Sequence, residues 1–441
     1  MLDCPISAGG ISKQDARSAT VTKEVILVLL LALTLRAGVA LGLHALLADQ
    51  QQFLIPGDAD GYWLLGQKLA AGEDYRIYNP PRHVLRMPGF PLFLAGCIRV
   101  FGESLLWPRL VLAVIGTAGC GFVIWLGQML VDQRTGLTAG LLAAISPTLT
   151  GFSAVILSET IFATCLMGSL LLLARLSRTW LKDDVTHMQP LLATAAGAAI
   201  ALACYMRPSW LLVAPLFAAA HVAASVWRSA PEFPLKRSVI EGACVVLGMA
   251  VMLVPWTVRN YSVTGHAIPT TLWVGPSLYD GLNPQADGGS DMTFFKNDRL
   301  MDSMSEYEMD REYRRRAVQF ATDNPGRAIS LGFAKLARYW SLWPNADQFR
   351  KRWWTKPVVA AFTLPMFVCA AIGVCRVRHD VRLLLVTLSP VLYFTAIHSV
   401  FVGSLRYRLP AEYPLLILAS VGLLTLWDRF RPSPNAPAEI A

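Results

Sequence analysis

The chain is divided by recurrent apolar blocks that have the character of membrane-spanning segments. Examples are VILVLLLALTL, LVLAVIGTAGCGFVIWLG and LLILASVGLLTL. A helix that crosses the hydrocarbon core of a bilayer needs roughly 20 apolar residues, and these blocks approach that length together with their flanks. Charged residues make up only 16% of the chain, below the roughly 25% of soluble domains. The blocks therefore predict an all-α integral membrane protein.

About ten transmembrane helices are expected, which places both termini on one side of the membrane. No small-residue cleavage site follows the first block, so it is expected to remain as the first span. The spans are placed at approximately 25–47, 105–130, 136–152, 155–174, 191–206, 208–226, 239–257, 357–374, 383–399 and 409–427. The chain then consists of an N-terminal tail (1–24), a single transmembrane domain (25–428) and a C-terminal tail (429–441).

The basic residues indicate which side is cytoplasmic. They gather before the first span, after the last span and in alternate short loops: Lys13, Arg17, Lys23, Arg134, Arg175, Arg178, Lys182, Arg228, Lys236, Arg237, Arg376, Arg378, Arg382, Arg429 and Arg431. Cytoplasmic loops are enriched in Lys and Arg, so both tails are expected in the cytoplasm. Membrane orientation accounts for the net charge of +9, and nucleic-acid binding is rejected. The two long segments, 48–104 and 258–356, then lie on the extracytoplasmic side.

The outer segments carry short helices that are expected at the membrane interface. In segment 48–104, DGYWLLGQKLA and GFPLFLAGCIRVFG are partly apolar and bounded by Gly and Pro. In 327–343, apolar residues recur at helical spacing with Arg and Lys between them, which predicts an interfacial helix and not another span. The preceding stretch predicts a solvent-exposed helix with Ser-x-x-Glu caps at Ser303 and Ser305, ended by an Asn-Pro pair.

Three acidic residues are candidates for catalysis. Asp58 and Asp60 open the first outer segment in GDADGYW, directly before an interfacial helix. In an extended stretch their side chains point to opposite sides. Asp60 is placed to cap the helix, which leaves Asp58 as the general base, and a capping role for either residue is the alternative. Glu159 lies in LSET, near the outer end of a span. A charged carboxylate is costly to place within the membrane, so it usually pairs with another group or takes part in function.

Basic and aromatic residues at the same surface are candidates for substrate binding. Arg82 and Arg86 lie in RHVLRMPGFP; a guanidinium suits a phosphate, and headgroup anchoring is the alternative. Further candidates stand where spans meet the outer surface: Arg207, Arg259, Asn260, His398, Arg406, Tyr407 and Arg408. An ordinary interfacial belt is the alternative for each of these. Arg36, within the first span, is expected to be a buried ion-pair partner.

The sequence contains none of the common soluble-enzyme motifs. It has no GxxxxGK[ST], no HExxH and no GxSxG element, so nucleotide hydrolysis, zinc proteolysis and serine hydrolysis have no support. Its eight cysteines form no CxxC pair and no disulfide framework. No cofactor and no metal ligand is assigned, and a contribution from a divalent metal is left open.

The order of several short motifs resembles a known membrane family. DADGYWLLGQKLAAG, RMPGFPLFLAG, LSET, RPSWLL, PWTVRNY, LARYW and RYRLP follow one another between about residues 25 and 425. In this order they resemble the multi-spanning, GT-C type glycosyltransferases, which transfer sugars from polyprenyl phosphates. The pattern is similar to that of bacterial protein mannosyltransferase-like proteins and lipid A aminoarabinose transferases.

The resemblance implies roles for individual residues. An aspartate in the first outer loop lies at the catalytic centre in that family, and Asp58 fits through its four-residue distance to Tyr62. Arg86 matches a basic residue that contacts the donor phosphate, and Glu159 matches a second acidic residue. The Arg-Tyr-Arg of RYRLP matches a motif before the last span. The chain has Arg-Met-Pro-Gly where the aminoarabinose transferases have a Lys-Pro-Pro run, so the acceptor is left open.

The expected function is transfer of a hexosyl or pentosyl group, with inversion, from a polyprenyl-phosphate donor to a lipid, glycan or protein acceptor. The expected place is the cytoplasmic (inner) membrane of a bacterium, with an extracytoplasmic active site and membrane lipid as a partner. The alternatives are a lipid-linked-sugar flippase or transporter and a non-catalytic relative that binds polyprenyl phosphate. A transporter is expected to carry ionisable residues in the middle of several spans, and only Arg36 is placed there.

Overall fold

The computed structural model of the chain describes residues 13–49, 54, 57–178, 189–228, 234–344 and 355–430. Within these residues there is no β-strand, only an isolated antiparallel bridge between Ile77 and Arg82. Eight helices of the described part are long and apolar enough to cross a membrane. The expected all-α, multi-pass membrane fold is confirmed. The expected tails lie outside the described residues, apart from 13–24 and 429–430.

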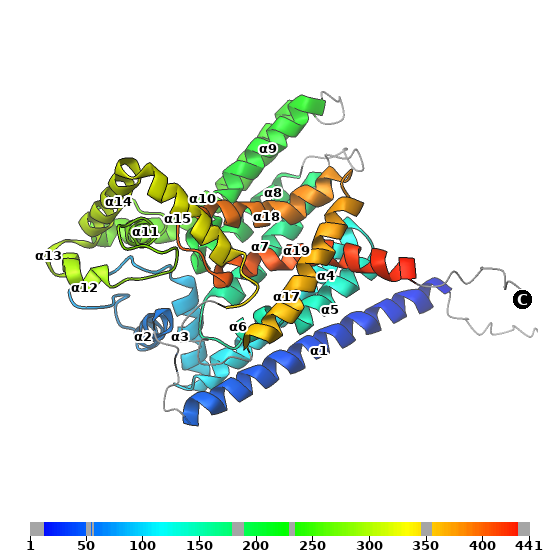
Figure 1. Ribbon diagram of the computed structural model, residues 1–441, viewed down its shortest axis with the longest axis horizontal. Coiled ribbons are helices and arrows are strands. Elements are labelled where there is room, and N and C mark those ends of the chain that lie inside the picture. Colours follow the sequence, from blue (N-terminus) through cyan, green and yellow to red (C-terminus); the bar gives the residue numbers. More distant parts are fainter. Residues whose placement is uncertain are drawn as a thin grey trace, which may run out of the picture.

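The long apolar helices form one bundle (Figure 1). They are α1 (Lys13–Asp49), α4 (Leu106–Leu130), α7 (Glu159–Leu176), α10 (Leu235–Thr264), α17 (Thr355–Arg376), α18 (Val381–Val400) and α19 (Leu405–Phe430), with an eighth span, Pro208–Trp227, made of the 3-10 turn η2 (Pro208–Trp210) and α9 (Val213–Arg228). The shorter apolar helix α8 (Pro190–Met206) occupies the span expected at 191–206.

The span expected at 136–152 is divided into two helices. These are α5 (Gln133–Ile145) and α6 (Pro147–Phe152). Ser146 separates them with an extended backbone, and its hydroxyl caps the start of α6. Pro147 disfavours a helical conformation in the residue before it, so the break follows from local chemistry.

The span expected at 155–174 begins later than expected. Residues 153–158 form turns and bends, and α7 starts at Glu159. Glu159 therefore lies in the first turn of a spanning helix, where the unbonded N–H groups carry partial positive charge.

Helices α7 and α19 lie at the centre of the bundle, and α1 and α9 lie at its edge. In the most apolar part of α7 and of α19, 78% of residues are buried, against 17% in α1 and 22% in the span that contains α9. Small residues allow α17 and α19 to approach closely. A Cβ on Gly422 would lie 1.9 Å from the Cys369 carbonyl oxygen, and one on Gly373 would lie 2.0 Å from that of Leu418. Such contacts are typical of helix packing in membranes.

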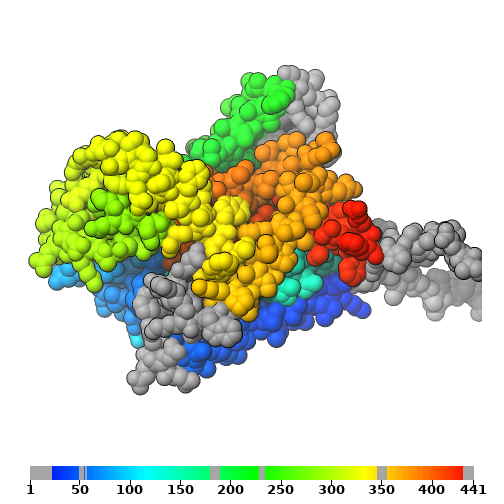
Figure 2. Space-filling model, viewed as in Figure 1, coloured from blue at the N-terminus to red at the C-terminus, as the bar shows by residue number. Residues whose placement is uncertain are grey.

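The short helices gather at one end of the bundle, opposite the end where α1 begins and α19 finishes (Figure 1). They are α2 (Asp58–Ala70), α3 (Gly89–Phe101), α11 (Val274–Gly281), α12 (Phe294–Asp298), α13 (Leu300–Ser303), α14 (Glu306–Asp323) and α15 (Pro325–Tyr339). In Figure 2 the yellow-green second outer segment packs against the blue first outer segment. The two outer segments of the sequence thus form one layer over the same end of the bundle.

The expected helix after Ser305 is present, but it is not exposed on all sides. Ser305 accepts a hydrogen bond from the Glu308 N–H, and the Glu308 carboxylate accepts one from the Ser305 N–H, which is the expected capping box. Met309, Tyr313 and Ala317 are fully buried. These three residues follow a four-residue spacing, so one face of α14 belongs to the core of the outer layer.

The expected ion pair of Arg36 is not found among the described residues. The Arg36 side chain is fully buried, and its guanidinium donates to the carbonyl oxygens of Ala32, at 3.3 Å, and Ala143, at 3.0 Å. The charge is thus stabilised by backbone dipoles of α1 and α5. The role of Arg36 in this structure is to join these two helices.

Candidate active site

Asp58 and Asp60 both lie in the first turn of α2, not in the extended stretch expected from the sequence. Gly57, with φ of 115°, precedes the helix in a conformation that other residues rarely adopt. The Asp60 carboxylate accepts a hydrogen bond from the Gly57 N–H at 3.2 Å, so Asp60 caps the helix as expected. Residues i and i+2 of a helix point about 200° apart. The two carboxylates therefore still face different ways, although the reason is helical geometry.

Asp58 is held between two arginines. An Asp58 oxygen lies 2.7 Å from Arg86, in the loop before α3, and the other lies 3.0 Å from Arg406, at the start of α19. Burial disfavours the charge of this carboxylate, but the charges of Arg86, Arg406 and Arg207 outweigh burial and hold the pKa of Asp58 below its usual range. Asp58 is therefore ionised at neutral pH.

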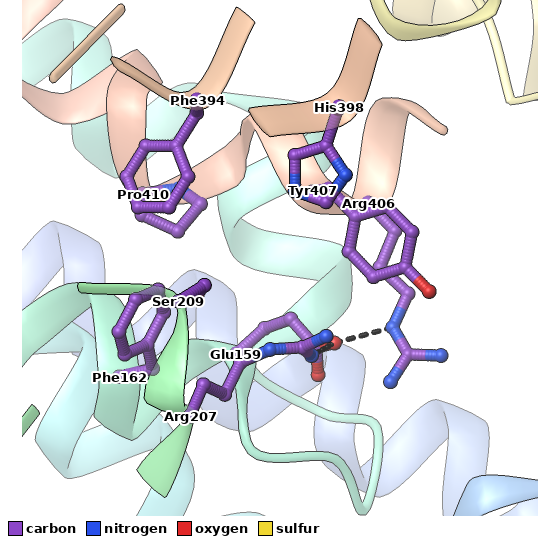
Figure 3. Close-up of a pocket in the computed structure, with 9 residues that line it drawn as sticks. All are labelled: Glu159, Phe162, Arg207, Ser209, Phe394, His398, Arg406, Tyr407 and Pro410. Carbon is purple, nitrogen blue, oxygen red and sulfur yellow. Dashed lines mark hydrogen bonds and ion pairs between the residues drawn. The ribbon is translucent and has the colours of Figure 1, made fainter. Parts of the chain in front are cut away.

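Glu159 is the second carboxylate of the site. Its side chain is 2% exposed and forms ion pairs with Arg207, which follows α8, and with Arg406 (Figure 3). Arg406 thus contacts both carboxylates. We call Asp58, Glu159, Arg86, Arg207 and Arg406 the open cluster. Its three guanidinium groups and two carboxylates leave one positive charge in excess, so the cluster can accept an anion.

Aromatic rings fix the arginines of the open cluster. The Arg86 guanidinium lies 5.0 Å from the centre of the Tyr62 ring, and the Arg207 guanidinium lies 5.1 Å from that of Tyr407. His398 stacks on Tyr407 with ring centres 4.5 Å apart. Cation–π contacts of this kind stabilise a guanidinium and restrict its orientation. Tyr62, Tyr407 and His398 therefore lie beside the arginines of the open cluster.

A small pocket opens beside the open cluster, between α7, η2, α18 and α19. One wall is charged and the other is apolar (Figure 3). The lining residues are Glu159, Phe162, Arg207, Ser209, Phe394, His398, Arg406, Tyr407 and Pro410. Phe162, Phe394 and Pro410 were not expected from the sequence. They belong to apolar spans and carry no local signal that separates them from other lipid-facing or core residues.

Four other predicted binding residues lie outside the open cluster and bond to backbone. Arg82 donates to the carbonyl oxygens of Met301 and Met304. Arg259 donates to those of His83 and Tyr75. Asn260 donates to that of Ile268, and Arg408 to those of Tyr339 and Ser341. In this structure these four side chains hold segments of the chain together.

A metal site is not formed by the residues that the structure describes. They contain no group of three or more His, Cys, Asp or Glu side chains placed to bind a metal ion. The two carboxylates of the open cluster are bonded to arginines instead.

Comparison with known proteins identifies the fold. No protein-family profile matches the chain, and a search of curated protein sequences finds no match. Among solved structures, the archaeal oligosaccharyltransferase AglB from Archaeoglobus fulgidus, in complex with an inhibitory peptide and a dolichol-phosphate, matches 94% of this chain with 12% identity and a TM-score of 0.51. The match covers 51% of AglB, so this chain spans about half the length of that protein.

Two further solved structures match over most of the chain with lower scores. An oligosaccharyltransferase from Archaeoglobus fulgidus in the apo form matches 91% of this chain and 51% of its own, with 13% identity and a TM-score of 0.48. ArnT from Cupriavidus metallidurans, bound to undecaprenyl phosphate, matches 96% of this chain and 82% of its own, with 14% identity and a TM-score of 0.36. The chain shares its fold with the AglB complex, and the multi-spanning GT-C-like fold expected from the sequence is thereby confirmed.

Proposed function

We propose that this chain is an inverting glycosyltransferase, which moves a hexosyl or pentosyl group from a polyprenyl-phosphate donor to a lipid, glycan or protein acceptor. The open cluster carries this proposal, because it combines an excess positive charge with an ionised carboxylate at one end of a membrane bundle. The fold shared with AglB, whose structure contains a dolichol-phosphate, supports it.

The arginines of the open cluster bind the donor phosphate in this proposal. Each guanidinium can form two parallel bonds to phosphate oxygens. When the bond between the anomeric carbon and the phosphate oxygen breaks, its electron pair stays on the oxygen, and the leaving lipid phosphate gains a negative charge. Arg86, Arg207 and Arg406 stabilise this charge as it develops. Glu159 orients Arg207 and Arg406 from its buried position at the start of α7.

Asp58 acts as the general base. It takes the proton of the acceptor hydroxyl or amine while the acceptor attacks the anomeric carbon from the face opposite the phosphate. Its pairing with Arg86 and Arg406 lowers its pKa and makes it a weak base without substrate. When the donor phosphate draws these arginines away, the pKa of Asp58 rises towards its ordinary value. Donor binding thereby prepares the base.

The activity is tested with purified protein in nanodiscs, a polyprenyl-phosphate sugar and an extract of envelope lipids and glycans as the source of acceptor. Mass spectrometry follows the release of polyprenyl phosphate and the appearance of the sugar on another molecule. Both are expected with the wild-type protein, and both are expected to be lost in Asp58→Asn. Continued sugar transfer by Asp58→Asn at the wild-type rate would contradict the role of Asp58.

A lipid-linked-sugar flippase is the second candidate, because the described spans hold other buried ionisable side chains in addition to Arg36. Glu241 in α10 pairs with His221 in α9 at 2.9 Å and with Arg237 at 3.0 Å, and all three side chains are at most 5% exposed. A flippase moves the donor intact, so the nanodisc assay would give no free polyprenyl phosphate. Release of polyprenyl phosphate therefore separates the two functions.

We further propose that the open cluster faces the extracytoplasmic side of a bacterial inner membrane. Gln285 is exposed in the outer layer, and the native Cys375 is exposed at the opposite end of α17. In intact cells, an impermeant thiol reagent should label Gln285→Cys and leave Cys375 unlabelled. Labelling of Cys375 alone would reverse the proposed orientation.

A further inference from the structure

The loop between α2 and α3 is held through its backbone by the second outer segment. The N–H groups of His83 and Val84 both donate to the carboxylate of Glu306, each at 2.8 Å. Their carbonyl oxygens accept hydrogen bonds from Arg259, at 2.6 Å, and from the Leu272 N–H, at 2.9 Å. All four backbone polar groups of these two residues are therefore engaged by residues of 259–306.

Glu306 contacts this loop from the first position of α14. Ser305 and Glu308 form the helix cap, which leaves the Glu306 side chain to face the loop. It is 6% exposed. A carboxylate is costly to bury unless hydrogen-bond donors meet its oxygens, and here one N–H group meets each oxygen. Burial raises the pKa of Glu306, and the two N–H groups oppose that rise.

Arg259 contacts the same loop from the end of α10. One nitrogen of its guanidinium donates to the carbonyl oxygen of His83 and another to that of Tyr75, at 3.0 Å. The plane of the group is fixed by two rings, with centres 5.3 Å away for Tyr75 and 4.9 Å away for Trp256. The two ring centres lie 5.6 Å apart, so both rings pack on the same side of the guanidinium and restrict its orientation.

Arg86 stands two residues beyond the anchored His83–Val84 pair. Trp273 directly follows Leu272, and its ring centre lies 5.7 Å from the Arg86 guanidinium. The 2.7 Å contact between Arg86 and Asp58 joins the loop to α2. A hydrogen bond of this length is lost when its partners move apart by about 1 Å. The position of the loop backbone therefore decides whether Arg86 meets Asp58.

We infer that Glu306 and Arg259 are positioning residues, which fix the loop backbone at His83 and Val84 so that Arg86 reaches Asp58 and the donor phosphate. The phosphate in this inference rests on the proposed function, whereas the hold on the loop is a property of the chain alone. The second outer segment then positions Arg86 in the site, although neither Glu306 nor Arg259 belongs to the open cluster.

The test uses two variants that act on opposite sides of the same peptide group. In Glu306→Gln the amide offers one acceptor oxygen, so one of the two N–H groups loses its partner. Arg259→Lys keeps the charge but cannot reach two carbonyl oxygens with a planar group. Glu308→Gln is the matched control, because Glu308 is exposed on the same helical turn and a glutamine can still complete the capping box.

Two measurements are made on each full-length variant. Hydrogen–deuterium exchange in detergent reports on the amides of 82–87, and native mass spectrometry in nanodiscs reports the affinity for undecaprenyl phosphate. Both variants should exchange faster in 82–87 and bind undecaprenyl phosphate roughly tenfold more weakly, the effect of losing about one hydrogen bond to a charged group. The control should match the wild-type protein in both measurements.

A comparison in the Arg86→Lys background separates positioning from a general loss of stability. If Glu306 acts through Arg86, Glu306→Gln should weaken binding much less when Arg86 is already replaced. Equal weakening in both backgrounds, unchanged exchange in both variants, or faster exchange with unchanged affinity would overturn the inference. A wild-type protein that does not bind undecaprenyl phosphate would instead overturn the proposed function. Hydrogen–deuterium exchange in 82–87 would then show whether Glu306 and Arg259 fix the loop backbone.

Discussion

Two arginines that stand two residues apart in α19 belong to very different surroundings. Arg406 contacts Glu159 and Asp58, and its side chain is 21% exposed beside a pocket. Arg408 pairs with Glu412 at 2.9 Å, and both side chains are at most 2% exposed. We call Arg408 and Glu412 the closed pair. The open cluster has room for a further group on one side, whereas the closed pair is surrounded by protein.

The remaining contacts of the closed pair explain this difference. Arg408 also donates to the carbonyl oxygens of Tyr339 and Ser341, and Glu412 accepts from the Thr148 hydroxyl at 2.8 Å. The pair thus joins the end of α15, the start of α6 and α19. The same kinds of side chain can therefore serve ligand binding or stability, according to whether their partners leave one side open.

The largest expected effect is on turnover, in Asp58→Asn. This change removes the proposed base of the open cluster, and it should reduce turnover by roughly 10²- to 10⁴-fold, the range for loss of a general base. Expression and donor binding should stay near those of the wild-type protein. Release of polyprenyl phosphate in nanodiscs measures turnover. A fully active Asp58→Asn protein would contradict this role and make Glu159 the next candidate for the general base.

Replacing a residue of the closed pair should lower the stability of the protein and leave its turnover unchanged. Arg408→Met leaves Glu412 buried without its charged partner, which costs on the order of 3–5 kcal/mol. Thermal melting in detergent should show the loss, whereas turnover per folded molecule should remain. Replacing both residues, in Arg408→Met with Glu412→Leu, should recover part of the stability. A stable Arg408→Met protein with weakened donor affinity would make Arg408 a binding residue after all.

A smaller effect is expected from Arg86, measured as affinity for undecaprenyl phosphate. Arg86→Ala removes charge-assisted hydrogen bonds and should weaken binding by roughly 10- to 100-fold. Arg86→Lys keeps the charge but loses the planar fork, so it should retain part of the affinity. Equal affinity of Arg86→Ala and the wild-type protein would leave Arg86 as a residue that only contacts lipid headgroups.

The smallest effect is expected from Asp60→Asn. Asp60 caps α2 through the Gly57 N–H, and asparagine caps helices nearly as well as aspartate. Turnover and melting temperature should both stay close to the wild-type values. Loss of turnover in Asp60→Asn, with an active Asp58→Asn protein, would exchange the roles of the two aspartates.

Local sequence features were sufficient to predict the fold and several residues that the structure brings together. The apolar blocks predict spans because the bilayer sets their length, and Ser-x-x-Glu predicts the helix start at Ser305 because its chemistry is complete within four residues. The break at Ser146 could also be read from the proline that follows it. The sequence also indicates Glu159, because a carboxylate inside a span is costly unless it pairs or takes part in function. Asp58 and Arg86 are indicated by their motifs, GDADGYW and RHVLRMPGFP.

Long-range partners could not be predicted in the same way. Arg82 donates to a carbonyl oxygen 219 residues away, and Arg259 to one 176 residues away. A backbone carbonyl has no signature in the sequence, so an arginine that binds one cannot be told from an arginine that binds phosphate. Glu306 stands beside the recognised capping residue Ser305, and only the folded structure shows that its carboxylate faces the loop at His83 and Val84.

If a lipid phosphate enters the open cluster, a structure determined by electron cryomicroscopy should show it there. The protein would be prepared in nanodiscs that contain undecaprenyl phosphate. Phosphate density is expected within hydrogen-bond distance of Arg86, Arg207 or Arg406, with at least one of these side chains turned away from Asp58. Phosphate density bound elsewhere, with the ion pairs of Asp58 and Glu159 unchanged, would contradict it.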